Sequence, residues 1–475
     1  MRVAIVAEGS YPFISGGVAS WIHMLISNLP DIEFEIISIM PEQFEDDKQY
    51  KYTLPRNVNY VWLYKLGKPS KRSAAITKLS PQQQEHVAGW LAFRHTNGEA
   101  LQLLGNASVI GNADSFFQSR HFWEIVKDSY TAEGQAGSFL DYFWTYRSMC
   151  APIITLLQNP FPNVDIVHAV STGYAGLVGA YMKQQQHIPF MLTEHGIYSR
   201  EREEEILQAS WIPNIYKKKW IQYFHHLSRQ AYESADDIIT LFQRNSLYQE
   251  EIGAPKEKLK IIPNGIPYER LSKIKRPASS KTLKIGAIVR VVPIKDIKTM
   301  IYAARLLADE QVDFQLSIMG PLDEDPEYAQ ECTELVARLR VGQYVKFLGQ
   351  VNIIEHLPHF DVLLLTSISE GQPLAVLEGM AAGIPWVATD VGSCAELLFG
   401  QEGDPFGQAG FVVPPVNPKA VAQACKWMAQ NRDMAAAYGQ NGKKRVESMY
   451  QLKNVINTYR ALYKERGGQH GRHRL

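Results

Sequence analysis

The chain has 475 residues, 45% of them hydrophobic and 21% charged, and its 49 Lys and Arg residues balance its 49 Asp and Glu residues. This length exceeds the roughly 250–300 residues at which a single hydrophobic core stops growing, so we expect two or three domains. The hydrophobic content argues against a disordered protein, and the neutral charge excludes the basic field that nonspecific nucleic-acid binding requires, so no nucleic-acid partner is expected.

Cysteine usage and hydropathy bear on the cellular compartment. The four cysteines are scattered, with no CxxC motif and no metal-ligand spacing. We expect reduced, mostly buried thiols in a cytoplasmic protein. The opening MRVAIVAEG lacks the basic and long apolar segments of a signal peptide, and no apolar run approaches the ~18 residues of a membrane span. Membrane association is therefore expected to come through a partner.

The N-terminal part predicts a doubly wound parallel sheet. RVAIVAEG at residues 2–9 is short, branched and apolar and ends in glycine, as expected of a buried parallel strand. A loop and an amphipathic helix follow, and FEIISIM is a second strand. Further strands are predicted at DIVHAVS, PFMLTEHG, DIITLF and KLKIIPNG, with a helix over about 173–185. This alternation predicts a Rossmann-like domain over residues 1–272.

A helical insertion interrupts this domain at about residues 65–158. The segments WLAFRH, SFFQSRHFWEIV and FLDYFWTYRSM are rich in aromatic residues and follow helical patterns. One interpretation is a helical subdomain with its own core. The alternative is a cover over the acceptor side of an interdomain cleft, or a docking face for another protein.

A second alternating series follows the polar stretch KIKRPASSK at residues 273–281. TLKIGAIVR, FQLSIMG, VKFLG, DVLLLT, PWVAT and GFVVPP are predicted strands of a domain over residues 273–447. A final helix, within residues 448–475, is expected to cross back to the first domain. The predicted fold is therefore α/β, with two Rossmann-like doubly wound domains facing a cleft and ligands at the carboxyl ends of the strands.

Two acids follow the apolar strand DVLLLT. Glu370 and Glu378 are separated by eight positions, and Pro373 between them suits the first position of a helix, which predicts a helix from Leu374 to Ala382. The free amides and dipole of a helix start favour a phosphate, and a carboxylate can accept hydrogen bonds from a sugar or ribose diol. Alternatively, Glu370 is an acid favoured by the helix dipole and Glu378 an exposed helix residue.

Two cations follow the first strand of the second series. Arg290 comes directly after the strand, and Lys295 lies five residues further on, at the start of another helix. Fixed cations beside a nucleotide diphosphate would stabilise the charge that develops as it departs. The alternative is solvated surface charge, which is the expected state of Lys298.

Two weaker signals come from the N-terminal domain. Gly16 and Gly17, in SGGVASW, precede a helix and would let backbone amides approach a phosphate or a reacting ligand, although glycines also form ordinary turns. His195, in LTEHGIYSRERE, ends a strand, where its imidazole could bind a sugar hydroxyl or could be a satisfied buried histidine.

These stretches together resemble the large family of retaining glycosyltransferases with the GT-B fold, the fourth in the usual classification. The matching elements are the E-x7-E pair Glu370 and Glu378, the diphosphate cations Arg290 and Lys295, the glycine loop at Gly16 and Gly17, the strand-end His195 and the turn Pro263–Gly265.

The resemblance implies a mechanism and a role for each residue. Transfer would occur on one face of the sugar with retention, Arg290 and Lys295 would stabilise the departing diphosphate, Glu370 would bind the sugar and Glu378 the ribose. His195 would contact the donor sugar near the reacting carbon. Backbone amides near Gly17, Leu374 and Ala375 would add to the diphosphate site, and the base would lie near Val351.

Four longer stretches, among them AEGSYPFISGGVASW and RVVPIKDIKTM, resemble most the family members that act in bacterial Pel exopolysaccharide synthesis. This implies a UDP-sugar donor carrying a hexose or N-acetylhexosamine, a growing polysaccharide as acceptor, no other cofactor, and a membrane-embedded synthase complex as partner. Val289, Asp296 and Gln372 depart from the broad family pattern, and Gln372 bears on the choice of donor sugar.

Three alternatives stay open. Asp323 and Asp325 form a D-x-D sequence that could hold a divalent ion between phosphates, although an acid cluster at a helix start fits better, and no metal requirement is expected. A UDP-sugar epimerase of the same architecture would convert its substrate without an acceptor. A non-catalytic UDP-binding scaffold of a synthase complex would bind UDP without turnover.

Overall fold

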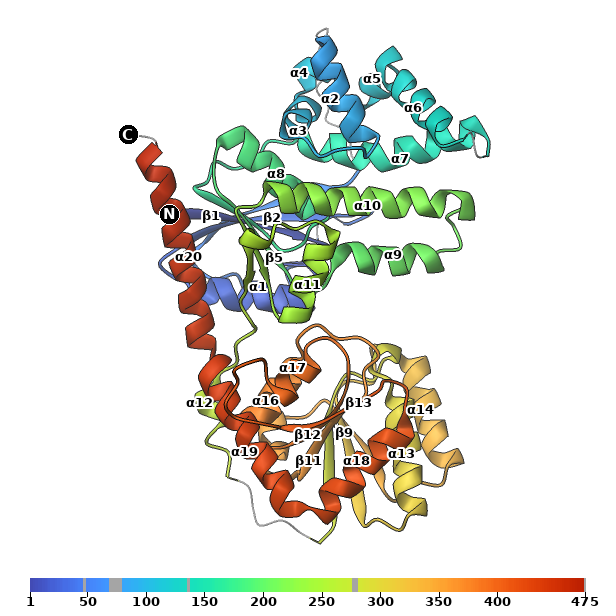
Figure 1. The fold of residues 1–475 in the computed structure, drawn as a ribbon, viewed down its shortest axis with the longest axis vertical. Helices are drawn as coiled ribbons and strands as arrows, with labels where there is room; N and C mark the ends of the chain where they lie inside the picture. The colour runs from blue at the N-terminus through green and yellow to red at the C-terminus, as the bar shows by residue number, and fades with distance from the viewer. Residues whose placement is uncertain (46–47, 68–78, 135–136, 276–280, 474–475) are drawn as a thin grey trace. The chain divides into compact units, whose positions relative to one another are not determined.

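The computed structural model describes residues 1–45, 48–67, 79–134, 137–275 and 281–473. The chain forms two compact units, each built on its own parallel sheet (Figure 1). Unit 1 comprises Met1–Thr240, Asn245–Ile261 and Thr458–Leu475, and unit 2 comprises Leu241–Arg244 and Ile262–Asn457.

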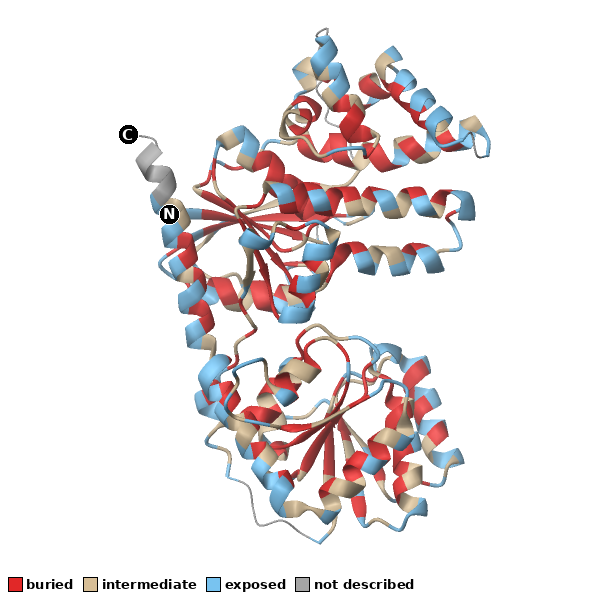
Figure 2. Ribbon diagram, in the orientation of Figure 1, coloured by how far each residue is buried: buried red, intermediate tan, exposed pale blue. Residues whose placement is uncertain are grey.

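Unit 1 has a seven-stranded sheet in the order β3-β2-β1-β4-β5-β6-β7, and every neighbouring pair is parallel. The strands are β1 Arg2–Glu8, β2 Glu33–Met40, β3 Val58–Lys65, β4 Ile166–Ala169, β5 Phe190–Glu194, β6 Asp237–Thr240 and β7 Leu259–Ile261. The strand order reverses between β1 and β4, which is the switch point where ligands bind in doubly wound sheets. The central strands are buried along most of their length (Figure 2), because helices cover both faces of the sheet.

Strand β3 was missed by the sequence analysis, which predicted six strands in this half. Two of its eight residues are exposed and five are only partly buried, and among the described strands it pairs only with β2, at the edge of the sheet. Such an edge strand lacks the continuous apolar run that marks the buried strands.

The helices of unit 1 fall into two groups. Those that belong to the doubly wound domain are α1 Gly17–Ser27, α8 Tyr174–Gln186, α9 Tyr198–Gln208, α10 Asn214–Ser234 and α11 Gln243–Ile252. Those of the insertion are α2 Pro81–Leu91, α3 Gly98–Gly105, α4 Ala107–Ile110, α5 Ala113–Phe117, α6 Arg120–Ala132 and α7 Phe139–Leu157. Residues 68–78 and 135–136 of the predicted insertion lie outside the described residues.

The insertion does not have a core of its own, which corrects the first interpretation of its sequence. Its buried apolar side chains belong to one cluster with those of the sheet and of α8 and α10. Trp90 of α2 donates a hydrogen bond from its indole to Gln230 of α10 at 2.7 Å, and the rings of Phe93 and Tyr223 lie 5.6 Å apart. Aromatic residues on both sides bury more apolar surface together than either group would alone.

Unit 2 repeats the architecture with six parallel strands in the order β10-β9-β8-β11-β12-β13. The strands are β8 Leu283–Ile288, β9 Phe314–Met319, β10 Val345–Gly349, β11 Val362–Leu365, β12 Trp386–Thr389 and β13 Gly410–Val413. The helices are α12 Tyr268–Leu271, α13 Ile297–Asp309, α14 Pro326–Arg338, α15 Ile353–His356, α16 Leu374–Ala381, α17 Cys394–Phe399, α18 Pro418–Gln430 and α19 Arg432–Met449. All six strands predicted for this half are present, and the switch point lies between β8 and β11.

The division between the units follows Ile261, whereas the sequence analysis placed it after residue 272. The reason is that the Pro-Asn-Gly turn makes its contacts with unit 2. The backbone N–H of Asn264 donates to the side-chain oxygen of Gln372 at 2.6 Å. Residues 276–280 of the predicted linker lie outside the described residues. The last helix, α20 (Leu452–His473), begins in unit 2, and its residues from Thr458 onward belong to unit 1.

All four cysteines are buried free thiols, as expected from their scattered positions: Cys150, Cys332, Cys394 and Cys425. Within the described part of the chain, each helix is too short or too polar to cross a bilayer.

Candidate functional site

The predicted cationic and acidic residues of unit 2 follow the two strands that flank its switch point. Arg290 and Lys295 lie in the connection after β8, and Glu370 lies in the connection after β11. Because β8 and β11 are parallel neighbours, their carboxyl ends meet at one edge of the sheet. The fold therefore brings together two loops whose charged residues are 75 positions apart in the chain.

Lys295 and Glu370 form an ion pair at this edge. The Lys295 ammonium donates to a carboxylate oxygen of Glu370, and both side chains are largely buried. The Ser367 hydroxyl donates to the same oxygen at 2.6 Å. A buried ammonium and carboxylate that satisfy each other can exchange partners when a charged ligand arrives, since either would be costly to leave alone.

Thr366 and Ser367, which sequence reasoning missed, fix the backbone around this pair. The Thr366 hydroxyl donates to the carbonyls of Lys295 at 3.1 Å and Asp296 at 2.9 Å. The backbone amide of Ile368 donates to the carbonyl of Ile294 at 2.9 Å. The two loops are thus joined directly by hydrogen bonds. The sequence feature that could have indicated their role is the pair of hydroxyl residues, Thr366 and Ser367, at the end of the apolar run DVLLLT.

Gly392, after β12, lets a third loop approach the Glu370 connection. Its φ is +53°, and a Cβ at this position would lie 2.1 Å from the carbonyl oxygen of Gly371 and 2.5 Å from that of Glu370. Only glycine fits such a close approach at this backbone conformation. Any side chain here would displace the loop that carries Glu370.

Helix α16 begins beside this site. Pro373 is its N-cap residue and the helix starts at Leu374, which corrects the expectation that Pro373 is the first helical residue. Among the described residues, no side chain caps the helix start, so the amides of Leu374 and Ala375 are available to an anionic group. Glu378 is half-buried on the same helix, and burial raises the pKa of its carboxyl. It is therefore not the fully exposed helix residue of the alternative interpretation.

Arg290 points to an acidic loop. Its exposed guanidinium bonds Glu324 at 2.8 Å and, within the described part of the chain, forms no ion pair with Glu370. Asp325 caps α14 by accepting from the amide of Tyr328 at 3.0 Å, as expected of an acid at a helix start. Within the described residues, no group of three or more His, Cys, Asp or Glu side chains has the arrangement of a metal site.

Two further predicted positions lie in unit 2. Val351 follows β10 by two residues and packs partly buried against the core of the unit. The amide side chain of Gln372 is buried and accepts from the backbone of Asn264. The Gln372 side chain thus bonds the Pro-Asn-Gly turn, and its bearing on the choice of donor sugar stays a prediction.

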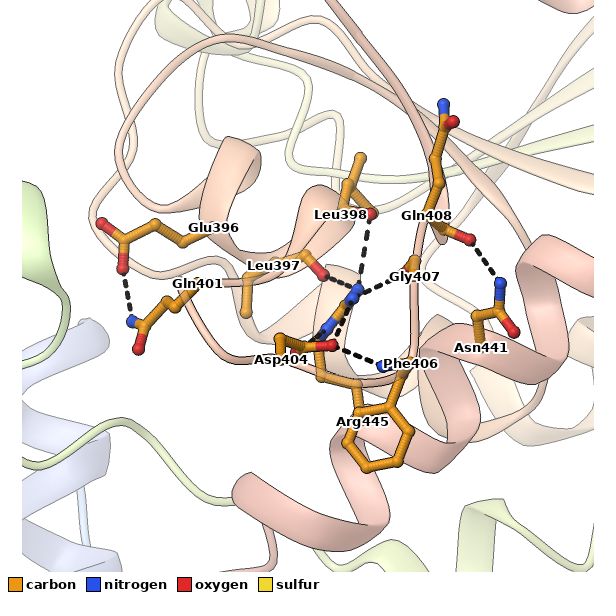
Figure 3. Close-up of polar contacts among 10 residues, drawn as sticks. All are labelled: Glu396, Leu397, Leu398, Gln401, Asp404, Phe406, Gly407, Gln408, Asn441 and Arg445. Carbon is orange, nitrogen blue, oxygen red and sulfur yellow. Dashed lines mark hydrogen bonds and ion pairs between the residues drawn. The ribbon is translucent and has the colours of Figure 1, made fainter.

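A buried arginine supports the loop that follows α17 (Figure 3). Arg445 of α19 is fully buried and makes a two-pronged ion pair with Asp404, at 2.6 and 3.1 Å. It also donates to the carbonyls of Leu397 at 2.8 Å and Gly407 at 2.5 Å. This pair fixes the connection from α17 to β13, and so the helix that follows the Gly392 loop.

The predicted residues of unit 1 gather at the carboxyl edge of its own sheet. Gly16 is the N-cap residue of α1 and Gly17 its first residue, and no side chain of the described part of the chain caps this helix start. A Cβ added at either glycine would meet no atom within 4 Å. The open space at this helix start fits a ligand that approaches the backbone amides.

His195 follows β5 directly and lies against Trp21 of α1, with ring centroids 4.7 Å apart and an edge-to-face angle of 73°. Burial lowers the pKa of its imidazole to about 4, so the ring is neutral at pH 7. The Nε2 atom of His195 and the indole nitrogen of Trp21 are buried and make no hydrogen bond with the described residues. Trp21, which sequence reasoning did not single out, therefore joins Gly16, Gly17 and His195 among the candidate residues of unit 1.

Two protein-family models match the chain. Residues 1–257 match a family model described as "Domain of unknown function (DUF3492)", and residues 270–445 match one described as "Glycosyl transferases group 1". The chain belongs to the DUF3492 family. The second match covers most of unit 2, including Lys295, Glu370 and α16, so this DUF3492 protein carries a glycosyltransferase group 1 domain.

Similar proteins and solved structures are consistent with these family matches. An N-acetyl-alpha-D-glucosaminyl L-malate synthase of Bacillus anthracis is 28% identical, covering 63% of this chain and 74% of its own. The amylovoran biosynthesis glycosyltransferase AmsK of Erwinia amylovora is 27% identical, covering 35% and 44%. Anabaena Alr3699/HepE, solved in complex with UDP, superposes over 98% of this chain and all of its own with a TM-score of 0.62 at 16% identity. The DUF3492 protein thus has the predicted GT-B fold of two Rossmann-like domains.

Proposed function

We propose that this DUF3492 protein is a retaining glycosyltransferase that uses a UDP-sugar as donor. The observation that carries the proposal is the Lys295–Glu370 pair at the switch point of unit 2, beside the uncapped start of α16. A cation, a carboxylate and free amides at one sheet edge are the groups needed to hold a sugar diphosphate.

In the proposed reaction, the bond between the anomeric carbon and the diphosphate oxygen breaks, and the acceptor hydroxyl oxygen bonds that carbon on the same face. The acceptor proton passes to the departing phosphate oxygen. Lys295, Arg290 and the amides of Leu374 and Ala375 stabilise the negative charge that develops. Arg290 leaves Glu324 to do so, since its guanidinium is exposed and its ion pair is weak.

Glu370 changes partner in this scheme. When the diphosphate takes the Lys295 ammonium, the Glu370 carboxylate keeps the Ser367 hydroxyl and gains the sugar hydroxyls as donors. Glu378 accepts from the ribose hydroxyls, which compensate its partial burial, and the base lies near Val351. Recognition of the sugar and of the diphosphate are then coupled through one carboxylate.

In unit 1, the neutral His195 supplies a hydrogen bond to the donor sugar near the reacting carbon, since its buried Nε2 lacks a protein partner within the described residues. Trp21 holds the imidazole ring in place. Amides near Gly17 add to the stabilisation of the diphosphate. None of these groups acts as a nucleophile.

We propose further that the transferred group is a hexose or N-acetylhexosamine and that the acceptor is a growing exopolysaccharide of the Pel type, as in PelF, in the cytoplasm beside a membrane-embedded synthase complex. Support comes from the motif-level resemblance and from AmsK, a relative named for amylovoran biosynthesis. No metal is required in this proposal: Asp325 of the D-x-D sequence caps α14, and Glu324 between the two aspartates bonds Arg290.

Calorimetry tests the donor assignment. We expect the protein to bind UDP and UDP-sugars, and the affinity for each to be the same in magnesium as in EDTA. Sugar should be transferred only when an acceptor is supplied. Binding of another nucleotide class, or a strict need for magnesium, would contradict the proposal. Conversion of UDP-sugar without acceptor would favour the epimerase, and UDP binding without any turnover would favour the scaffold.

A further inference from the structure

Exposed apolar side chains gather at one end of unit 1. Three lie at or beside the connection between α9 and α10, and Trp211 is the most exposed large apolar residue in the described part of the chain: Leu207 57%, Trp211 74% and Ile215 56%. In Figure 1 the α9–α10 connection and the nearby end of α7 lie on the same side of unit 1. Side chains of this size on a projecting turn have no role in the core of the unit.

This group continues onto the insertion. The terminal carbon of Ile215 lies 2.6 Å from where a Cβ on Gly137 would stand, and the Tyr216 hydroxyl donates to the Ser138 carbonyl at 3.4 Å. The helix that follows Ser138 exposes Leu140 and Trp144, and α6 beside it exposes Trp123. We call the six residues the apolar end: Trp123, Leu140, Trp144, Leu207, Trp211 and Ile215.

Lysines close the α9–α10 segment at the apolar end, and four of the neighbouring carboxylates are in ion pairs. Residues 208–218 contain no Asp or Glu, whereas Lys217 and Lys218 close the segment; Lys218 is exposed, and the Lys217 ammonium donates to the Leu207 carbonyl at 2.7 Å. The ion pairs are Glu204 with Arg200, Glu205 with Arg202, Glu124 with Arg120 and Glu133 with Lys219. Glu203 contacts His225, and Asp128 and Asp141 are exposed and form no ion pair with the described residues.

We propose that the apolar end binds the surface of an anionic lipid bilayer. Tryptophan and isoleucine on a projecting turn suit the boundary between headgroups and acyl chains, where the indole keeps its polar edge wet. Lysine beside them is attracted to anionic headgroups. A fluid interface needs no complementary shape, which fits apolar side chains spread over a turn and two helices better than the packed core of a protein interface does.

Flotation of the full chain with vesicles tests this surface. We expect the protein to float with vesicles of phosphatidylglycerol and phosphatidylcholine, less at high salt, and little with phosphatidylcholine alone. Trp211→Ser combined with Ile215→Ser should lower the bound fraction at least tenfold, and Lys218→Glu should reduce binding to the anionic vesicles only. Asp141→Asn should increase it.

A matched control is Val416→Ser, which removes an equally exposed apolar residue from unit 2 and should leave flotation unchanged. All these positions are exposed, and an unchanged circular dichroism spectrum and unfolding midpoint would show that each variant keeps its fold. As a second readout, brominated lipid should quench the fluorescence of the wild type more than that of Trp211→Phe.

Absence of flotation at physiological salt would overturn the proposal, as would undiminished flotation of the Trp211→Ser/Ile215→Ser variant. Flotation only with vesicles that carry native membrane proteins would overturn it in favour of a protein partner. The assay uses no sugar donor, so its failure leaves the proposed transferase activity untouched, and the reverse also holds.

Discussion

At the scale of single residues, the ion pair between Lys295 and Glu370 sets a competition between a carboxylate and a diphosphate for one ammonium. The Glu370 carboxylate both neutralises Lys295 and, in the proposed reaction, binds the sugar. The free energy of nucleotide binding is therefore less favourable, because the Lys295–Glu370 pair must be separated before Lys295 can bind the diphosphate.

Replacing Glu370 by Gln therefore separates the two roles. We expect Glu370→Gln to bind UDP about tenfold more tightly, because about 1.4 kcal/mol of competing attraction is removed, while sugar transfer slows. Calorimetry with UDP and initial rates of transfer measure the two effects. Weaker binding of UDP by this variant would show that the ion pair does not compete with the diphosphate.

Replacing Lys295 removes the cation of the pair instead of the carboxylate. Lys295→Met should lower the rate of transfer by about 10²–10³, the effect expected for the loss of a charge-stabilising group, while the fold is retained. Arg290→Met should act in the same direction. Lys298→Met is the matched control, since this neighbouring lysine is exposed and bonds Glu331 of α14. Full activity in both Lys295→Met and Arg290→Met would remove the diphosphate assignment.

Buried histidines make unit 1 sensitive to acid. Burial lowers the pKa of His226 to about 3, and both of its ring nitrogens lack hydrogen-bond partners within the described residues. Because the unfolded chain binds the proton near pH 6.5 and the folded chain does not, stability present above pH 6.5 is lost as the pH falls, at about 1.4 kcal/mol per pH unit.

His226→Leu should remove this dependence. We expect the difference in urea midpoint between pH 7.5 and pH 5 to shrink in the variant, with little loss of stability at pH 7.5, since leucine fills a similar volume beside Trp90. An unchanged difference between the two pH values would show that other groups, such as His168 with its pKa of about 3, dominate the acid response.

At the scale of elements, the loop from α17 to β13 depends on one arginine (Figure 3). Arg445 is buried with Asp404 and several backbone carbonyls, and although burial alone would raise the pKa of the Asp404 carboxyl, the hydrogen bonds from Arg445 hold it below its usual value. This contribution to stability is present above about pH 4 and is lost as the pH falls through the lowered pKa.

Arg445→Met should destabilise unit 2 by about 3–5 kcal/mol, because it leaves a buried carboxylate and three buried carbonyls without their donor. Denaturation followed by circular dichroism measures the loss. The double variant Arg445→Met with Asp404→Leu should recover part of it, since no charge is then left unpaired. A loss below about 1 kcal/mol would contradict the role of this pair in holding the loop.

The elements also show where sequence patterns succeed. Strands β8 to β13 were predicted because each is a short apolar run followed by a turn, which is the signature of a parallel strand buried on both faces. Strand β3 was missed because all but one of its residues are exposed or only partly buried, so it lacks a continuous buried apolar run. The core of the insertion was assigned wrongly, because aromatic helices that pack on α8 and α10 carry the same pattern as helices that pack on each other.

At the scale of the whole molecule, the chain ends by returning to unit 1. In α20, the Tyr463 hydroxyl lies 2.6 Å from His168 Nδ1, and Arg466 bonds the buried Asp237 through two nitrogens at 2.6 and 2.7 Å. Lys260 also bonds Asp237, at 2.7 Å. The last helix therefore completes the polar contacts of β4 and β6.

Arg466→Met should lower the stability of unit 1 by about 2 kcal/mol, less than the 3–5 kcal/mol expected for an unshared buried pair because Lys260 remains with Asp237. Calorimetric unfolding at pH 7 measures the shift. If the two units unfold as separate transitions, we expect only that of unit 1 to move, and movement of the unit 2 transition alone would contradict the assignment of this segment.

The sequence by itself determined the strand and helix pattern, the fold class and the positions of the charged residues after their strands, because burial on two faces and helix starts leave local signatures. Only the tertiary structure decided which of these residues meet: Lys295 with Glu370, Arg290 with Glu324, and His195 with Trp21. The physical reason is that such pairs depend on strand order and on long-range packing, and neither leaves a mark in the local spacing of residues.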